Sequence, residues 1–550
     1  MQSVESRSRA TAFVFVAVAL VSIGVPHTLL LSAGASVLLT THGIEALPIV
    51  YLGVGVMLIP FGWLVARMID AVDAETALLG VLTVRAAAAL VIFVAWSLGF
   101  ESLVAYAAPI WARVDVIIGL VALFRVSYKI FDLAEDKSWL VAVAACEPAS
   151  SLLTGLAAPF LLSGIDIGGM FLLAAVSLAV ATPLAQKVRK DVAADPVRWP
   201  ARPRRRHDGS RLALSPDMRS YLIWVAAAMT IWTVAHFLLD ALFHGLVAGA
   251  FAGEARRFTV FSYALAAAGF ISLLRIGFGE RRFLRRIGVR LLLVLLPTVL
   301  LGALALGTAA AFAFGSLFVL FLIVVVMKTL EYAVITGFYA RAWRSLLAPL
   351  PPRHGVRLVA AAERNVHAIG AGLAAMALIA IFGRVASGAG DGAGADAIWL
   401  IVAVIVLLSL LGLAISRMVQ RGYGEAVERA LMRRQKFGEV DMASSGRRSR
   451  AAIQRMLREG EGRDVIEAAR LQAELDPDGF VNMAPRLIAR GEREIVSALV
   501  ETVEEIARPE LFPPMAGRLT VEEDPALRDA LLTAAAATRH PRSPRLLAKA

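Results

Sequence analysis

Ionisable side chains interrupt long apolar stretches of this chain, and these are the residues whose types could do chemistry. Moving a lone charge out of water is costly, so each must be paired, hydrated or in contact with a ligand. An ionisable residue in such a position is therefore a candidate for function. The candidate binding residues are Arg85, Arg113, Asp115, Glu147, Asp240, Lys328, Glu331 and Arg364.

Some of these residues share one face of a helix with a partner three or four positions away. The pairs are Asp240 with His244, Lys328 with Glu331, and Arg364 with His367. Each pair has two readings: mutual neutralisation in a helix interface, or a ligand site in a water-filled cavity. Arg85 has no acid nearby in the sequence, so we expect it to meet Asp115 or Glu147 from another helix, or an anionic ligand.

Three of the cations could together hold a phosphate or carboxylate group. Arg85, Arg113 and Lys328 are expected to face a hydrated cavity. A guanidinium group suits this role because its planar fork binds an oxyanion through two hydrogen bonds. The ligand predicted for this set is a small anionic molecule.

Patterns typical of enzymes are absent from the sequence. There is no Gly-x-x-x-x-Gly-Lys-Ser/Thr loop, no Gly-x-Ser-x-Gly elbow, and no histidine or cysteine pair at metal-ligand spacing. The glycines at 388–394 follow no strand and indicate a connector. The single cysteine, Cys146, cannot form an internal disulfide and is expected to be a small packing residue. We therefore predict a protein that is not an enzyme and has no cofactor or metal.

The elements that must position these residues are membrane-spanning helices. Of the 550 residues, 58% are apolar and 18% charged, whereas soluble domains carry about 25% charged residues. Because a span needs about 20 apolar residues, the sequence predicts an all-α, polytopic membrane helical bundle of about 12 spans. The predicted spans are 11–39, 46–66, 77–98, 102–125, 138–162, 166–186, 220–247, 257–275, 290–307, 312–338, 357–383 and 397–417.

The distribution of basic residues predicts the orientation of the bundle. If the N-terminus is cytoplasmic, the outer linkers hold only Arg256, Arg257 and Arg384, and the other basic linkers lie inside. This asymmetry favours an even number of spans with the N- and C-termini both cytoplasmic. Since the orientation accounts for where the basic residues lie, the net charge of +12 does not indicate a nucleic-acid partner.

A basic, proline-rich stretch at 187–211 divides the spans into six and six. Its composition predicts an extended hinge loop, or a site for anionic lipid headgroups. Two six-span halves joined by such a loop are typical of major-facilitator transporters. The expected divisions are a first half at 1–186, a linker at 187–219, a second half at 220–419, a connector at 420–446 and a last domain at 447–550.

The last domain contains a short repeat. An Arg-apolar sequence begins at Arg455, Arg486 and Arg518, and an acidic residue follows it each time. A second apolar helix is expected after each, at 465–475, 495–506 and 527–537. Two helices in each unit of about thirty residues indicate a cytoplasmic α-solenoid similar to HEAT repeats. Such a surface suits contact with a protein partner.

Several stretches resemble the ATP/ADP antiporter (nucleotide transporter) family, a relative of the major facilitator fold. The sequence at 43–48 with Tyr51 is similar to the family's Gly-x-Glu-x-Leu-Pro segment. The sequences at 131–137, 328–332 and 348–351 resemble its fourth-span loop and tenth-span region. The resemblance covers roughly 20–420. Bacterial members with HEAT-like repeats behind the spans exist, so 447–550 resembles their layout.

The chain departs from the family at the fifth span, where Glu147 and Pro148 stand in place of flexible small residues. Acidic residues at Asp132, Glu135 and Asp136 also dilute the basic loop before it. The resemblance implies a multi-pass protein of the bacterial inner membrane that moves nucleotides or another anionic solute by alternating access, with the HEAT-like domain regulating it or binding a partner. The alternative is a non-transporting scaffold or receptor, in which the bundle is an anchor and the solenoid assembles a protein complex.

Overall fold

The computed structural model describes most of the chain as helices. The described residues are 2–131, 137–194, 216–277, 280–334, 346–347, 352–387, 393–432, 454, 456–457, 463–489, 493–538, 540–541 and 543. Within these residues there is no β-strand. They fall into two compact units, one of 1–284, 291–344 and 356–419, the other of 285–290, 345–355 and 420–550.

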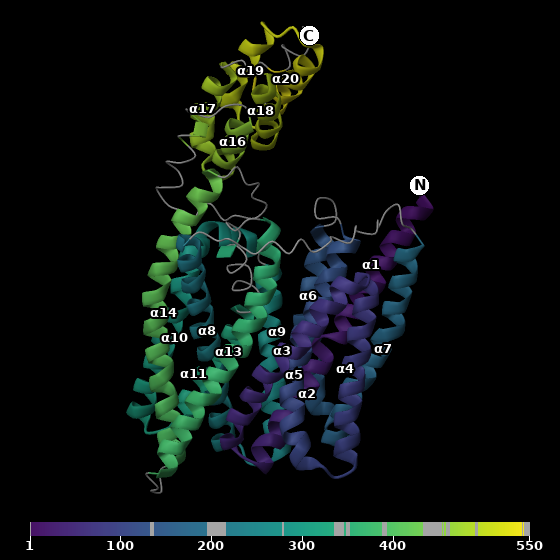
Figure 1. Ribbon diagram of the computed structural model, residues 1–550, viewed down its shortest axis with the longest axis vertical. Coiled ribbons are helices and arrows are strands. Elements are labelled where there is room, and N and C mark those ends of the chain that lie inside the picture. Colours follow the sequence, from purple (N-terminus) through teal and green to yellow (C-terminus); the bar gives the residue numbers. More distant parts are fainter. Residues whose placement is uncertain are drawn as a thin grey trace. The chain divides into compact units, whose positions relative to one another are not determined.

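The first unit is a bundle of long helices. Its first half contains α1 (Gln2–Ser22), α2 (Gly24–Thr41), η1 (Ile44–Ala46), α3 (Leu47–Ala71), α4 (Ala74–Ser97), α5 (Glu101–Ile130), α6 (Lys137–Leu161) and α7 (Ile167–Ala193). Its second half contains α8 (Pro216–Ala250), α9 (Glu254–Gly277), α10 (Glu280–Phe314), α11 (Leu317–Val334), α13 (Pro352–Ser387) and α14 (Ala393–Met432). A few residues of α10, α13 and α14 belong to the second unit. In Figure 1 the helices of each half are grouped, the first from purple to blue and the second from teal to green.

Eleven spans among the described helices are long and apolar enough to cross a membrane. They coincide with eleven of the segments predicted from the sequence. In lipid the backbone N–H and C=O groups of an apolar run must be hydrogen-bonded within the protein, and an α-helix does this within the run. The remaining predicted segment, at 312–338, coincides with α11, which has 18 described residues. At 1.5 Å per residue these cover about 27 Å, close to the hydrocarbon thickness. The predicted all-α membrane bundle is confirmed.

The first predicted span is two helices with a break between them. α1 ends at Ser22 and α2 begins at Gly24. Pro26 has no backbone N–H, so it cannot donate to the Ser22 carbonyl one turn earlier. The break therefore leaves a buried carbonyl oxygen that needs a donor from elsewhere.

Several helices extend further than the predicted spans. α7 continues to Ala193, so Lys187 and Lys190 are helical and do not belong to a loop. α10 begins at Glu280, and α14 continues to Met432 through the first part of the predicted connector. Basic residues at the ends of a span can extend a helix while their charged groups reach the interface. The remainder of the predicted linker and connector, at 195–215 and 433–446, lies outside the described residues.

Glycines allow the two halves to approach closely. A Cβ at Gly155 of α6 would lie 2.5 Å from the Ser262 carbonyl oxygen of α9, and one at Gly269 of α9 would lie 2.5 Å from the Pro148 carbonyl oxygen of α6. Only a residue without a side chain fits at either position. This contact between α6 and α9 joins the halves along small residues, as is common between membrane helices.

The second unit contains short amphipathic helices. They are α16 (Arg463–Leu475), α17 (Pro477–Ala489), α18 (Arg493–Ile506), η4 (Pro509–Leu511), α19 (Phe512–Leu519) and α20 (Pro525–Ala537). Helices α16, α18 and α20 occupy the positions expected for the second helix of each repeat. α18 packs against both of the others, and α17 packs against α19. The core consists of buried apolar side chains such as Val465, Phe480 and Leu531.

Candidate functional site

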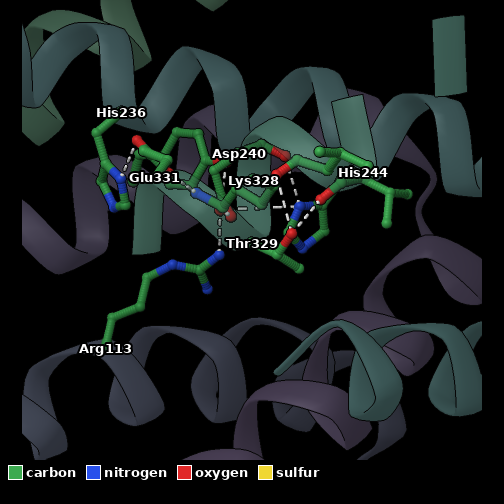
Figure 2. A network of polar contacts seen from close by, with 10 residues as sticks. Arg113, His236, Asp240, His244, Lys328, Thr329 and Glu331 are labelled. Carbon is green, nitrogen blue, oxygen red and sulfur yellow. Dashed lines mark hydrogen bonds and ion pairs between the residues drawn. The ribbon is translucent and has the colours of Figure 1, made fainter. Parts of the chain in front are cut away.

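A network of charged side chains joins the two halves of the bundle around Asp240 of α8 (Figure 2). Arg113 of α5 donates from Nη2 to Asp240 Oδ2 at 2.5 Å. Tyr51 of α3 donates from Oη to the same oxygen at 2.9 Å. Lys328 of α11 lies 3.3 Å from Asp240 Oδ1. One carboxylate thus accepts from two residues of the first half and one residue of the second.

The network continues along α11 and α8. Lys328 Nζ donates to Glu331 Oε2 at 3.0 Å, across the i,i+3 spacing predicted to place them on one face. His236 Nδ1 donates to Glu331 Oε1 at 2.7 Å. His236 precedes Asp240 by four residues, so both project from the same face of α8. Glu331 is therefore held between a cation on its own helix and an imidazole on α8.

His244 is the third residue of that face of α8. Its Nδ1 donates to the Asp240 backbone carbonyl at 2.7 Å and lies 3.7 Å from Asp240 Oδ2. The ring is buried and packs on Phe261 of α9, with ring centroids 4.8 Å apart. Since the backbone bond places the proton on Nδ1, the imidazole is fixed beside the network and is not its acceptor.

The network carries balanced charge and is partly open. Two cations, Arg113 and Lys328, face two acids, Asp240 and Glu331, so the set is neutral when the histidines are neutral. The side chains of Arg113, Lys328 and Asp240 are 12%, 12% and 10% exposed, and that of His236 is 26% exposed. A buried ion pair is strong only when its geometry is good, because both ions lose hydration. Partial exposure lets water or a solute reach groups that are otherwise surrounded by helices.

Arg85 and Asp115 form a separate pair within the first half. Arg85 of α4 donates from Nε and Nη2 to both oxygens of Asp115 on α5, each at 2.7 Å. Both side chains are 0% exposed. Nη2 also donates to the Ser22 carbonyl at 2.5 Å, the oxygen left without a donor by Pro26. Gly119 of α5 makes room for the guanidinium, since a Cβ there would lie 2.4 Å from Arg85 Nη1.

Glu147 lies in a third place, on α6. Its Oε1 accepts from the Tyr332 hydroxyl of α11 at 2.7 Å and from Ser151 at 3.4 Å. The Tyr332 ring stacks on His27 of α2, with centroids 6.5 Å apart. His27 Nδ1 in turn donates to the Ala112 carbonyl at 3.1 Å. Glu147 is thus linked to the second half through a phenol and does not touch the Asp240 network.

The structure therefore distributes the sequence candidates over three places. Arg113, Asp240, Lys328 and Glu331 come together, Arg85 pairs with Asp115, and Glu147 stands apart. The side chain of Arg364 lies outside the described residues. Sequence reasoning missed Tyr51, Tyr332 and His236 as site residues. The spacing of four between His236 and Asp240 could have indicated the histidine, whereas nothing local marks a tyrosine that bonds a residue from another helix.

This arrangement is suited to binding a charged solute. Within the described residues no group of three histidine, cysteine or acidic side chains could hold a metal ion. Arg113 and Lys328 can donate to an oxyanion, and the face of Tyr51 lies 5.6 Å from the Arg113 guanidinium carbon, a distance at which a cation and a ring attract. The groups come from four helices of both halves, so a relative movement of the halves must change the site.

No protein-family model matches the chain, and no curated protein matches it. Its fold is similar to those of solved membrane transporters. A nucleoside transporter, NupG, has a TM-score of 0.50 and 13% identity over 74% of this chain and 99% of that one. A D-xylose-proton symporter has a TM-score of 0.51 and 13% identity over 73% and 96%. A peptide transporter, POT, has a TM-score of 0.50 and 13% identity over 74% and 95%. The bundle therefore has the fold of a major-facilitator-type transporter, as the six-plus-six pattern predicted.

Proposed function

We propose that this protein moves a small anionic solute across a membrane by alternating access, and that the solute binds at Arg113, Asp240, Lys328 and Glu331. The observation that carries the proposal is the contact of Arg113 on α5 with Asp240 on α8, which joins the halves inside the bundle. A rocking movement of the halves would open and close this contact. The substrate would then control which side of the bundle is open.

Asp240 indicates where the anionic group of the solute binds. Its carboxylate receives Arg113, Tyr51 and Lys328 together. A phosphate or carboxylate of a solute can accept from the same donors, and the guanidinium fork favours oxyanions. Binding of the solute would displace Asp240 from the two cations. The displaced carboxylate lies one turn after His236 and one turn before His244, on the same face of α8.

Nucleotides are the solute class that we test first. The sequence resembles nucleotide transporters at 43–48 with Tyr51 and at 328–332, and these two stretches contain Tyr51, Lys328 and Glu331 of the network. One structure of similar fold is that of a nucleoside transporter. The aromatic face of Tyr51 beside Arg113 could take a base or a sugar. The same proposal places the protein in the bacterial inner membrane with both termini on the cytoplasmic side. It also includes anionic lipids bound at 187–211.

The experiment is uptake of labelled ATP by purified protein in liposomes loaded with ADP. We expect saturable uptake that unlabelled ATP, ADP or phosphate inhibits and that uncharged uridine does not. Arg113→Met should reduce the uptake by about 100-fold, while the variant Glu101→Gln at an exposed position keeps it. Competition by uridine without competition by any anion would overturn the anionic assignment. A folded protein that takes up none of the anions tested would overturn transport through this site.

A second candidate function is a membrane scaffold, in which the second unit binds a protein partner. The specific observation in its favour is that the cations of the network are neutralised within the chain. A bundle that no longer transports would also keep its charges paired. The discriminating result is uptake by the full chain. Two results together would favour the scaffold function over transport. The full chain takes up none of ATP, ADP and phosphate, and deletion of 447–550 removes one defined, stoichiometric partner protein.

Under either function, the repeat pattern of the second unit supports a HEAT-like domain that binds a protein. The helices that follow Arg486 and Arg518 in the sequence pack on one another in order. Arg508 forms an ion pair with Asp478 at 3.1 Å, and both side chains are exposed. Exposed pairs of this kind add little stability, so the surface is available for contact with a protein that regulates transport or assembles with it.

A further inference from the structure

Glu147 differs from Asp115, Asp240 and Glu331 in having no arginine or lysine nitrogen within ion-pair distance. Asp115, Asp240 and Glu331 each lie within 3.3 Å of an arginine or lysine nitrogen. Glu147 is 8% exposed, and its partners are the hydroxyl groups of Tyr332 and Ser151. No ion pair of Glu147 occurs in the described part of the chain. A buried carboxyl group whose direct partners are only hydroxyls can remain a neutral acid, because no cation touches it and a charge in such a place is costly.

The position of Glu147 in the fold is the contact between the halves. On one side Gly24 of α2 packs closely, since a Cβ there would lie 2.6 Å from the Glu147 carbonyl oxygen. On the other side Gly269 of α9 packs in the same way on Pro148. Tyr332 of α11 completes the surroundings. When the halves rock, a group at this contact can be exposed to water first on one side of the membrane and then on the other.

The charged and titratable groups around Glu147 come from three helices. The Arg275 guanidinium of α9 acts on it electrostatically, and the phenol of Tyr332 on α11 contacts it directly. His27 of α2 stacks on that phenol. On its own helix the neighbouring Cys146 donates to the Ala142 carbonyl. Loss of the proton would place a negative charge beside the close contact of Pro148 with Gly269, so the charge state of Glu147 acts on the packing of α6 against α9.

Glu147 is also connected to the proposed solute site through α11. Tyr332 follows Glu331 directly and lies one helical turn after Lys328. The same short helix therefore carries the phenol that bonds Glu147 and two charges that bind Asp240 and His236. A displacement of α11 at Lys328 must also displace Tyr332, because a helix is stiff over one turn.

We propose that Glu147 is a proton-binding site that couples solute movement to a proton gradient. The carboxylate takes one proton from the side on which the bundle is open and releases it on the other side; no other bond forms or breaks. The hydrogen bond from Tyr332 changes when Glu147 gains or loses the proton. Because Tyr332 is on α11, this change acts on the solute-site residues of the same helix. This inference rests on the proposed transport function, and it adds the ion that drives it.

The first test measures the proton without any solute. Infrared difference spectra between acidic and alkaline buffer are recorded on the protein in lipid bilayers. We expect the band of a protonated carboxyl group that disappears at alkaline pH, is lost in Glu147→Gln and remains in Glu101→Gln. Tyr332→Phe should keep the band and shift it, since the carboxyl loses a hydrogen bond. A titrating band in Glu147→Gln identical to that of the parent, or no shift in Tyr332→Phe, would overturn the proposal, and the second variant serves if the first does not fold.

The second test measures coupling with labelled ATP as the probe. In the parent, a proton gradient across the liposome should increase ATP accumulation, and a protonophore should abolish the increase. Glu147→Gln should lose this response and keep ATP/ADP exchange at equal pH. If exchange occurs and the variant still responds to the gradient, proton coupling at Glu147 is wrong while transport stands. If the parent moves no ATP, the proposed nucleotide function fails, and the infrared band alone decides whether Glu147 binds a proton.

Discussion

Two arginine–aspartate pairs in this bundle have the same chemistry and different surroundings. Arg85 and Asp115 belong to neighbouring helices of one half, and both side chains are fully buried. Arg113 and Asp240 belong to different halves, and their side chains are 12% and 10% exposed. The first pair is bidentate and also holds the Ser22 carbonyl. The second shares its acid with Tyr51 and Lys328.

The difference shows that a charge within a span is not by itself a mark of a ligand site. Arg85 is explained by the fold, because Pro26 breaks a helix and a buried donor must satisfy the freed carbonyl. Arg113 also donates to a backbone carbonyl, that of Pro109 at 3.1 Å, but this oxygen is one turn earlier on the same continuous helix and not at a break between helices. Arg113 joins two bodies that have to move if the protein transports. Exposure and connection between halves, and not the presence of charge, separate the proposed solute site from the structural pair.

The largest effect should come from breaking the structural pair. Arg85→Ala leaves Asp115 buried without a cation and the Ser22 carbonyl without a donor, and removing one partner of a buried pair costs about 3–5 kcal/mol. We expect a lower thermal unfolding midpoint in detergent and poor recovery of folded protein. The double variant Arg85→Met with Asp115→Leu should recover most of the stability, since an apolar pair of similar volume needs no counter-charge. An Arg85→Ala protein as stable as the parent would contradict the structural role.

The next effect concerns the pair across the halves. Arg113→Met should reduce uptake of the solute by about 100-fold, which corresponds to about 2.7 kcal/mol of lost binding in the transport cycle. Stability should fall much less than in Arg85→Ala, because Lys328 still neutralises Asp240 at 3.3 Å. Uptake and unfolding midpoints are measured on the same preparations. If Arg113→Met lowers the unfolding midpoint as much as Arg85→Ala does, the Arg113–Asp240 pair is as structural as the Arg85–Asp115 pair.

The sequence was sufficient for the bundle but not for the site. Apolar runs predict spans because lipid leaves the backbone no other structure, and eleven of the predicted segments recur as spans. Which charges meet depends on the rotation of each helix and on breaks such as the one at Ser22. Asp115 was one of three alternatives for Arg85, beside Glu147 and an anionic ligand, and the structure has Arg85 in contact with Asp115. That Asp240 would bind Arg113 from three helices earlier in the chain could not be derived, because no local spacing connects α5 with α8.

The third effect concerns the packing between the halves. Gly155→Ala places a Cβ 2.5 Å from the Ser262 carbonyl oxygen and 2.9 Å from the Ala266 Cβ, so α6 and α9 must separate. Overpacking of this kind costs about 1–3 kcal/mol, and we expect slower uptake together with a lower unfolding midpoint. Gly372→Ala is the matched control, because its Cβ would meet nothing within 4 Å. Equal behaviour of the two variants would show that the contact between the halves is looser than the glycines indicate.

The smallest effect tests a single hydroxyl of the proposed solute site. Tyr51→Phe removes the hydrogen bond to Asp240 and keeps the ring beside Arg113. A hydrogen bond to a charged group contributes about 1.5–3 kcal/mol, but part of this is regained when Asp240 relies on Lys328 and Arg113 alone. We expect the apparent affinity for the solute to change by about 3- to 10-fold, with the unfolding midpoint nearly unchanged.

The direction of that change sharpens the distinction between the two pairs. If the solute replaces Asp240 as the acceptor of the Tyr51 hydroxyl, Tyr51→Phe removes a donor that the solute uses, and the apparent affinity should fall. The ring alone remains in Tyr51→Phe, so a solute that is held by stacking should keep its affinity for the variant. The measurement is uptake as a function of ATP concentration in Tyr51→Phe and the parent. An unfolding midpoint that falls as far as in Arg85→Ala would place Tyr51 and Asp240 among the structural contacts and would leave Arg113 and Lys328 alone as the solute site.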